Sequence, residues 1–88
     1  MREAINQEVS VVSYYSARDQ EYKPHLLHWQ NKDYPLGKVD YHHAPTEGKT
    51  LFHIYELCDK EQTIWFRLKL NTDNMHWLLE AVSDGLAN

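Results

Sequence analysis

The sequence contains little of several features that would define a class of protein. It has 1 cysteine, 3 glycines and 3 prolines in 88 residues, and no apolar run approaches the ~18 residues that span a membrane. One cysteine cannot form an internal disulfide, which excludes a disulfide-stapled mini-protein. The glycines are dispersed, so no glycine-rich loop is available to hold a phosphate. Residues 1–6 carry no apolar signal-peptide core, and we expect a cytoplasmic protein that is not inserted in a membrane.

Positive charge is scarce as well. The 9 Lys and Arg residues against 13 Asp and Glu residues give a formal charge of 9 − 13 = −4 with histidine neutral. Because neutralisation of phosphates dominates affinity for nucleic acid, this charge disfavours nucleic-acid binding. Aromatic residues, in contrast, are plentiful, since the chain contains 3 Trp, 6 Tyr and 2 Phe, and it also contains 6 His. Such enrichment favours strands and a folded chain.

Turn-forming clusters recur about every ten residues, which is the spacing typical of a small all-β domain. They leave six short runs, of which residues 63–70 are the clearest. Ile64, Phe66 and Leu68 alternate there with other residues, and this period of two places one set in the core and the other outside. We therefore predict one all-β domain over residues 1–88, with its core in about 8–84, in which six short, mostly antiparallel strands form a small barrel or rolled sheet. The predicted core residues are Val9, Val11, Leu27, Trp29, Tyr34, Leu36, Phe52, Ile54, Ile64, Phe66, Leu68, Leu70, Trp77 and Leu79.

The third run of the chain changes phase. Tyr34 and Leu36 have one parity, whereas Val39 and Tyr41 have the other. One extra residue in a strand moves the following side chains to the opposite face, so we predict a bulge near Gly37. Glycine readily adopts the left-handed conformation that such a bulge often needs.

The last run fits two structures. Its apolar residues follow the spacing of an amphipathic helix, which slightly favours a helix over residues 73–84 packed on a β-sheet. The alternative is a strand over residues 76–82, with Trp77 and Leu79 on one face. The residues at helical spacing are Met75, Leu78, Leu79, Val82 and Leu86.

Two stretches of the chain carry a resemblance. Residues 23–36 contain the pattern Trp-x-x-Lys-x-Tyr, formed by Trp29, Lys32 and Tyr34, after a proline and an aromatic-rich strand. Residues 66–80 run from a strand through a short turn to the sequence Trp-Leu-Leu. Together these motifs resemble a group of short bacterial proteins, common in Firmicutes, that are filed as a domain of unknown function. The resemblance extends over roughly residues 8–84.

The chain departs from that family's pattern at Asn71, where Asp is more usual, and at residues 35–37. The resemblance implies a six-stranded, mostly antiparallel small barrel or rolled sheet. It also implies that residues 77–79 form a strand rather than a helix. It implies no activity, because none is established for the family.

The histidines do not form a recognisable metal-binding pattern. His25 and His28 lie three positions apart and His42 and His43 are adjacent, so on strands each pair faces opposite sides. A zinc site would need histidines from several strands, with Cys58 as a further ligand. No Cys-x-x-Cys or His-Glu-x-x-His spacing supports such a site, and we predict no metal and no cofactor.

No residue has the surroundings of a catalytic group. A nucleophile needs a neighbouring base and a group that orients the base, and Cys58 ends an apolar strand, where a buried, unreactive thiol is the usual outcome. Glu56 lies between Tyr55 and Leu57, so an inward-facing Glu56 would have a raised pKa. We predict that the protein is not an enzyme.

The remaining candidates for function are side chains predicted to face outward. The candidate binding surface consists of Trp65, Arg67 and Lys69, with Tyr55 beside them. Strand edges and exposed aromatic rings suit the addition of a strand from another chain. We therefore predict a protein-interaction or accessory module whose partner is another protein or a second copy of the chain. The alternative is single-stranded nucleic-acid binding, in which bases stack on the same rings.

Overall fold

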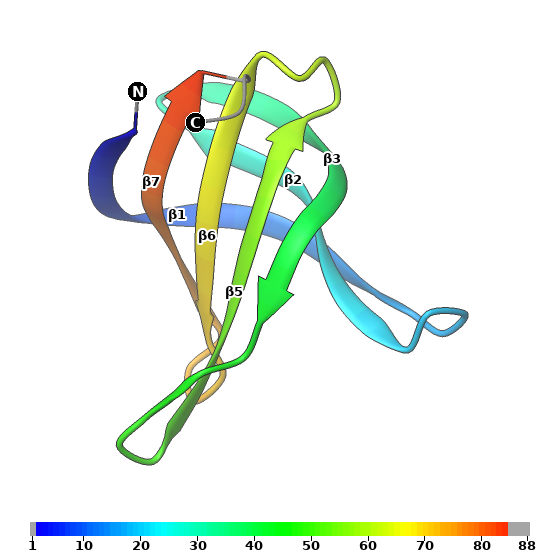
Figure 1. Cartoon of the computed structure of the whole chain (residues 1–88), viewed down its shortest axis with the longest axis vertical. Coiled ribbons are helices and arrows are strands. Elements are labelled where there is room, and N and C mark those ends of the chain that lie inside the picture. The colour runs from blue at the N-terminus through cyan, green and yellow to red at the C-terminus, as the bar shows by residue number, and fades with distance from the viewer. Residues whose placement is uncertain (1, 85–88) are drawn as a thin grey trace.

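The chain folds as a closed barrel of antiparallel strands in a computed structural model that describes residues 2–84 (Figure 1). Six strands follow one another around the ring in the order β3-β2-β1-β7-β6-β5, and β3 pairs with β5 to close it. The short β4 pairs with β5 alone. The prediction of a small six-stranded all-β barrel is confirmed. The strands are β1 (Glu3–Ser16), β2 (Glu21–Trp29), β3 (Lys32–His43), β4 (Thr46–Glu47), β5 (Thr50–Asp59), β6 (Ile64–Asn71) and β7 (His76–Asp84).

The last strand, β7, is where the helical alternative fails. Its backbone pairs with β6 on one edge and with β1 on the other. A helix over residues 73–84 is therefore a wrong prediction, because it would satisfy its own backbone and leave the facing edges of β1 and β6 unpaired. Trp77 and Leu79 lie in the core, as the strand alternative requires. Leu86, which belonged to the helical pattern, lies outside the described residues. No helix in residues 2–84 is long and apolar enough to cross a membrane.

The core fills the inside of the barrel. Most predicted core residues are buried, Ile54 of β5 among them, but Phe52 is not, and the prediction leaves out the two β5 residues of the core cluster. Tyr55 and Leu57 belong to the core cluster, whereas Ile54 is buried outside it and Phe52 is only half-buried. β5 is apolar at both parities, so alternation could not show which set faces inward. The cluster consists of Leu27, Trp29, Tyr34, Leu36, Tyr55, Leu57, Phe66, Leu68, Leu70, Trp77 and Leu79, with Val9, Val11 and Ile64 among the partly buried residues packed against it.

β3 contains the bulge that its change of phase predicts. Its register against β5 shifts between Leu36 and Val39, and shifts again between Val39 and Tyr41. Gly37 does not have the positive φ expected of it. Its role is spatial instead, since a Cβ atom there would lie 3.3 Å from the backbone oxygens of both Cys58 and Asp59. The missing side chain lets β3 approach β5 where the barrel closes.

Leu68→Ala is expected to lower the free energy of unfolding by roughly 2–5 kcal/mol, because the fully buried side chain leaves a cavity when it is truncated. Leu51→Ala is the matched control, since Leu51 on β5 is 38% exposed. We expect it to cost less than about 1 kcal/mol. Denaturant unfolding of the two variants measures both losses, and equal losses would contradict this placement of the core.

Candidate functional site

The four residues of the predicted binding surface do not lie on one surface. Arg67 and Lys69 face outward from β6, as alternation predicts. Tyr55 pairs with Leu68, points into the barrel and is 2% exposed. Trp65 faces outward but is only 8% exposed. The prediction that the rings of Tyr55 and Trp65 are exposed is therefore wrong.

The outer face of β6 is covered by contacts within the chain. The guanidinium carbon of Arg2 lies 4.4 Å from the ring centroid of Trp65. Arg67 donates hydrogen bonds to the carboxylates of Glu56 at 3.2 Å and Glu80 at 3.0 Å, which come from the two flanking strands. Glu56 thus faces outward toward a cation rather than into the core.

Lys69, the second cation of this face, is engaged in the same way. Its Nζ lies 3.1 Å from a carboxylate oxygen of Glu47 and 4.2 Å from the ring centroid of Phe52. A nucleic-acid backbone would have to displace these carboxylates to reach the cations, and bases cannot stack on a ring that Arg2 covers. This face is poorly suited to binding a single strand.

A labelled single-stranded oligonucleotide titrated into the protein at low salt is therefore expected to give a flat signal. The same titration near 1 M salt is the control, because it suppresses binding through phosphates. Binding at low salt that weakens as salt rises would contradict this expectation and favour the nucleic-acid alternative.

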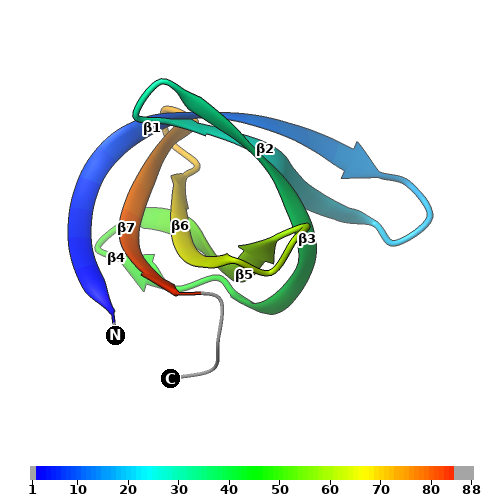
Figure 2. The same cartoon turned by 90° about the horizontal axis from the view of Figure 1, so that it is seen from above.

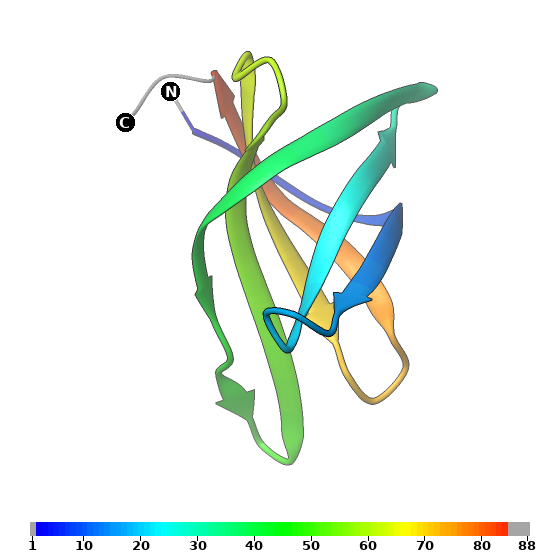
Figure 3. The same ribbon diagram turned by 90° about the vertical axis from the view of Figure 1, so that its right-hand side faces the viewer.

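β2 and β3 diverge away from their shared turn (Figure 3). A groove lies between them. These strands pair only between Leu26–Trp29 and Lys32–Pro35. Pro35 ends the pairing because it has no N–H, and its carbonyl accepts a hydrogen bond from the Lys60 N–H at 2.9 Å. Beyond Pro35, β3 pairs with β5, while β2 continues alongside β1 into a hairpin that projects from the barrel (Figure 2).

The groove has a volume of about 490 Å³ and a mixed aromatic and charged lining. One wall is the hairpin of β1 and β2, and the other is the second half of β3. Its aromatic lining residues are Tyr14, His25, Tyr41, His42 and Tyr55. Its charged lining residues are Glu21, Lys23, Lys38 and Asp40.

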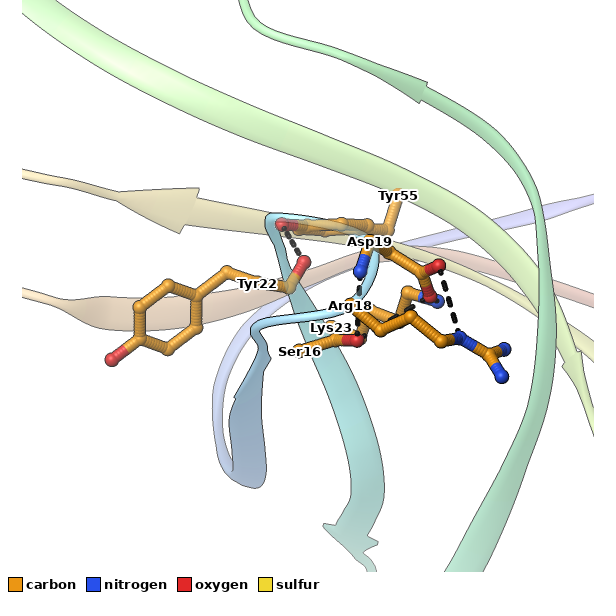
Figure 4. A network of polar contacts seen from close by, with 6 residues as sticks. All are labelled: Ser16, Arg18, Asp19, Tyr22, Lys23 and Tyr55. Atoms are coloured by element: carbon orange, nitrogen blue, oxygen red, sulfur yellow. Dashed lines mark hydrogen bonds and ion pairs between the residues drawn. The ribbon is translucent and has the colours of Figure 1, made fainter.

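Tyr55 joins the core of the barrel to this groove. Its ring packs 5.7 Å from that of Trp77, and its hydroxyl donates a 2.8 Å hydrogen bond to the backbone carbonyl of Tyr22 on β2 (Figure 4). Burial, and secondarily the charge of Glu21, raises the pKa of Tyr55 to about 12. The hydroxyl therefore keeps its proton at neutral pH, and the bond ties β2 to β5 across the base of the groove.

Two histidines lie beside Tyr55. The His42 ring stacks on the Tyr55 ring with centroids 4.5 Å apart, and its Nε2 lies 2.8 Å from Nδ1 of His53, so one nitrogen donates and the other accepts. Burial, followed by the positive charge of His53, lowers the pKa of His42. Within residues 2–84, no cluster of three or more His, Cys, Asp or Glu side chains is placed to hold a metal ion.

The tip of the projecting hairpin is held by Asp19. Its carboxylate accepts a 2.6 Å hydrogen bond from Lys23 Nζ and lies 3.7 Å from the guanidinium of Arg18 (Figure 4). The hydrogen bond and charge of Lys23 lower the pKa of Asp19, and the hydrogen bond to Asp19 raises that of Lys23. The charge of Lys23 is therefore compensated within its own hairpin.

The other residues considered for metal binding or catalysis do not share one site, because each has a different neighbour. His25 contacts the Tyr14 ring edge-on at 5.8 Å, and His28 lies 2.7 Å from a carboxylate oxygen of Asp33. Burial, followed by the charges of neighbouring aspartates, raises the pKa of the Cys58 thiol. The thiol is therefore protonated at neutral pH, which lowers its reactivity.

No family model, curated protein or solved structure matches the chain. The resemblance to the bacterial family stays a prediction, and function has to be inferred from the groove itself.

Folding stability is expected to fall as the pH drops through the range in which histidine titrates. The pKa of His42 lies below its ordinary value of 6.5, so the unfolded chain binds a proton at this residue at a higher pH than the folded chain does. Stability therefore decreases from near pH 6.5 down to the folded pKa of His42. Denaturant unfolding at about pH 8 and about pH 5 measures the loss, in a range where histidine is the side chain that titrates. His42→Phe, which keeps a ring on Tyr55 but cannot titrate, should lose less stability between these pH values, and an equal loss would contradict the assignment.

Proposed function

We propose that the protein is a non-enzymatic protein-interaction module of the cytoplasm that binds an extended segment of a partner in the groove between β2 and β3. The observation that carries the proposal is the change of partner in β3 at Pro35. Beyond that residue β3 uses one edge to pair with β5, and its other edge lines the groove.

The groove-facing edge of β3 supports strand addition. Within residues 2–84, no strand pairs with this edge along residues 36–42. An extended peptide laid against such an edge gains main-chain hydrogen bonds, and contacts with its alternate side chains supply specificity. The opposite wall is less able to accept a strand, since Pro24 has no N–H and the Tyr22 carbonyl is already bonded to Tyr55. We therefore assign β3 as the receiving strand.

Exposed tyrosines at the groove also support the proposal. Tyr14 from β1 and Tyr41 from β3 line it and are 48% and 53% exposed. The ring of Tyr14 contacts His25 at 5.8 Å, and the ring of Tyr41 contacts His43 at 5.1 Å, so each has a neighbour that restricts it. Tyrosine offers a large contact area with few rotatable bonds and is enriched among residues that dominate binding energy.

Selection of binders from a display library of random linear peptides, with the whole chain as bait, tests this function. The affinity of recovered peptides is then measured for the unmodified chain and for Tyr14→Ala. Loss of an aromatic anchor that contributes more than about 1.4 kcal/mol should weaken binding roughly 10-fold or more.

Tyr15→Ala is the matched control for this experiment. Tyr15 is the next residue in the same hairpin and is 56% exposed, but it does not line the groove. Its truncation should change affinity less than about 2-fold, as surface substitutions away from a contact do. Equal losses in the two variants, or a library that yields no binder, would contradict the proposal.

Sedimentation of the free chain identifies a second copy as the occupant if the chain dimerises and Tyr14→Ala restores the monomer.

A further inference from the structure

We infer that the bound segment carries a lysine or arginine side chain that lies in the groove beside Glu21 and Asp40. This inference rests on the proposed function, because it describes the partner of the same groove. It concerns the charges that line the groove and how many of them are already compensated by the chain itself.

Two of the charged lining residues are acidic and two are basic, but their surroundings differ. Lys23 is bound to Asp19 at 2.6 Å, so its charge is matched before any ligand enters. Neither Glu21 nor Asp40 forms an ion pair with a residue in the described part of the chain. Among the described residues, the groove therefore presents two carboxylates that form no ion pair, against one cation that forms none, Lys38.

Glu21 lines the groove together with Tyr55 and His42. Its negative charge adds to the burial that raises the pKa of Tyr55, and it partly opposes the burial and the charge of His53 that together lower the pKa of His42. Glu21 thus lies near the stacked rings at the base of the groove. The charge of −4 over the whole chain adds an attraction for a basic partner at longer range.

The aromatic lining favours a cation for a second reason. Lysine and arginine are attracted to the faces of aromatic rings, and this chain already uses such contacts elsewhere. Lys69 Nζ lies 4.2 Å from the Phe52 ring centroid, and Lys32 Nζ lies 5.1 Å from that of Tyr34. Tyr14 and Tyr41 in the groove offer the same kind of surface to a side chain of the partner.

The experiment measures the affinity of peptides recovered from the random library for three charge variants of the whole chain. Glu21→Gln and Asp40→Asn each remove one carboxylate with little change of shape, and we expect each to weaken binding about 5-fold, as for a partly exposed charge pair. Lys38→Gln is the matched control, because it removes the opposite charge from the same groove. We expect it to leave binding unchanged or to strengthen it.

The peptide supplies the complementary test. Replacing its basic residue with glutamine should weaken binding to the unmodified chain about 5-fold, and should have little further effect on Glu21→Gln if the two groups are in contact. Binding to the unmodified chain should also weaken as salt rises.

The outcomes separate this inference from the proposed function. In one outcome, recovered peptides are bound less tightly by Tyr14→Ala but equally well by Glu21→Gln and Asp40→Asn. That result would overturn the inference of a basic side chain and leave the groove as the binding site. A loss of binding in Lys38→Gln would show an acidic segment instead, and would also overturn the inference. If the library yields no binder, both proposals fall together.

Discussion

The structure depends on the way a single strand, β3, divides its backbone between two neighbours. A sheet of six strands becomes a barrel only if its two outer strands meet, and here β3 and β5 do so. β3 pairs with β2 up to Pro35 and with β5 after it. Gly37 stands directly after this change, where a side chain would press on two carbonyl oxygens of β5. Proline at the point of departure and glycine at the point of approach thus allow closure.

Closure of the barrel opens the groove. The strand that leaves β2 to reach β5 leaves β2 bound to β1 alone, as a hairpin that projects from the barrel. The groove is therefore a direct result of the geometry that encloses the core. Tyr55 belongs to both, because its ring packs in the core while its hydroxyl holds the backbone of Tyr22. The base of the groove is consequently formed by a residue buried in the barrel interior, whereas the tyrosines of its rim are exposed.

The sequence was informative where alternation was clean. Residues 63–70 have one apolar parity, and their faces were predicted correctly. β5 is apolar at both parities, so Tyr55 was assigned to the outside although it lies in the core. Trp65 has an outward parity, but its burial arises partly from Arg2, a residue far away in the chain whose contact no local pattern can show.

The groove itself could not be predicted, although its signals are present. Pro24 and Pro35 interrupt the hydrogen-bonding pattern of two strands, and the change of phase around Gly37 predicts a bulge. The structural effect of these signals depends on which strands pair. A proline that ends one pairing opens a groove only if the strand then pairs with a different strand. That strand, β5, comes after the prolines in the chain, and the pairing that selects it is a property of the whole barrel.

The burial of all three tryptophans has a practical consequence for work in solution. Trp29 packs against Tyr34 and Phe66, and Trp65 lies under Arg2, both outside the lining of the groove. Trp77 reaches the groove only through the ring of Tyr55. The intrinsic fluorescence of the chain is therefore chiefly a reporter of the folded barrel. Of the three tryptophans, Trp77 is the one linked to the groove through the ring of Tyr55, so its emission is the component expected to respond to events at the base of the groove.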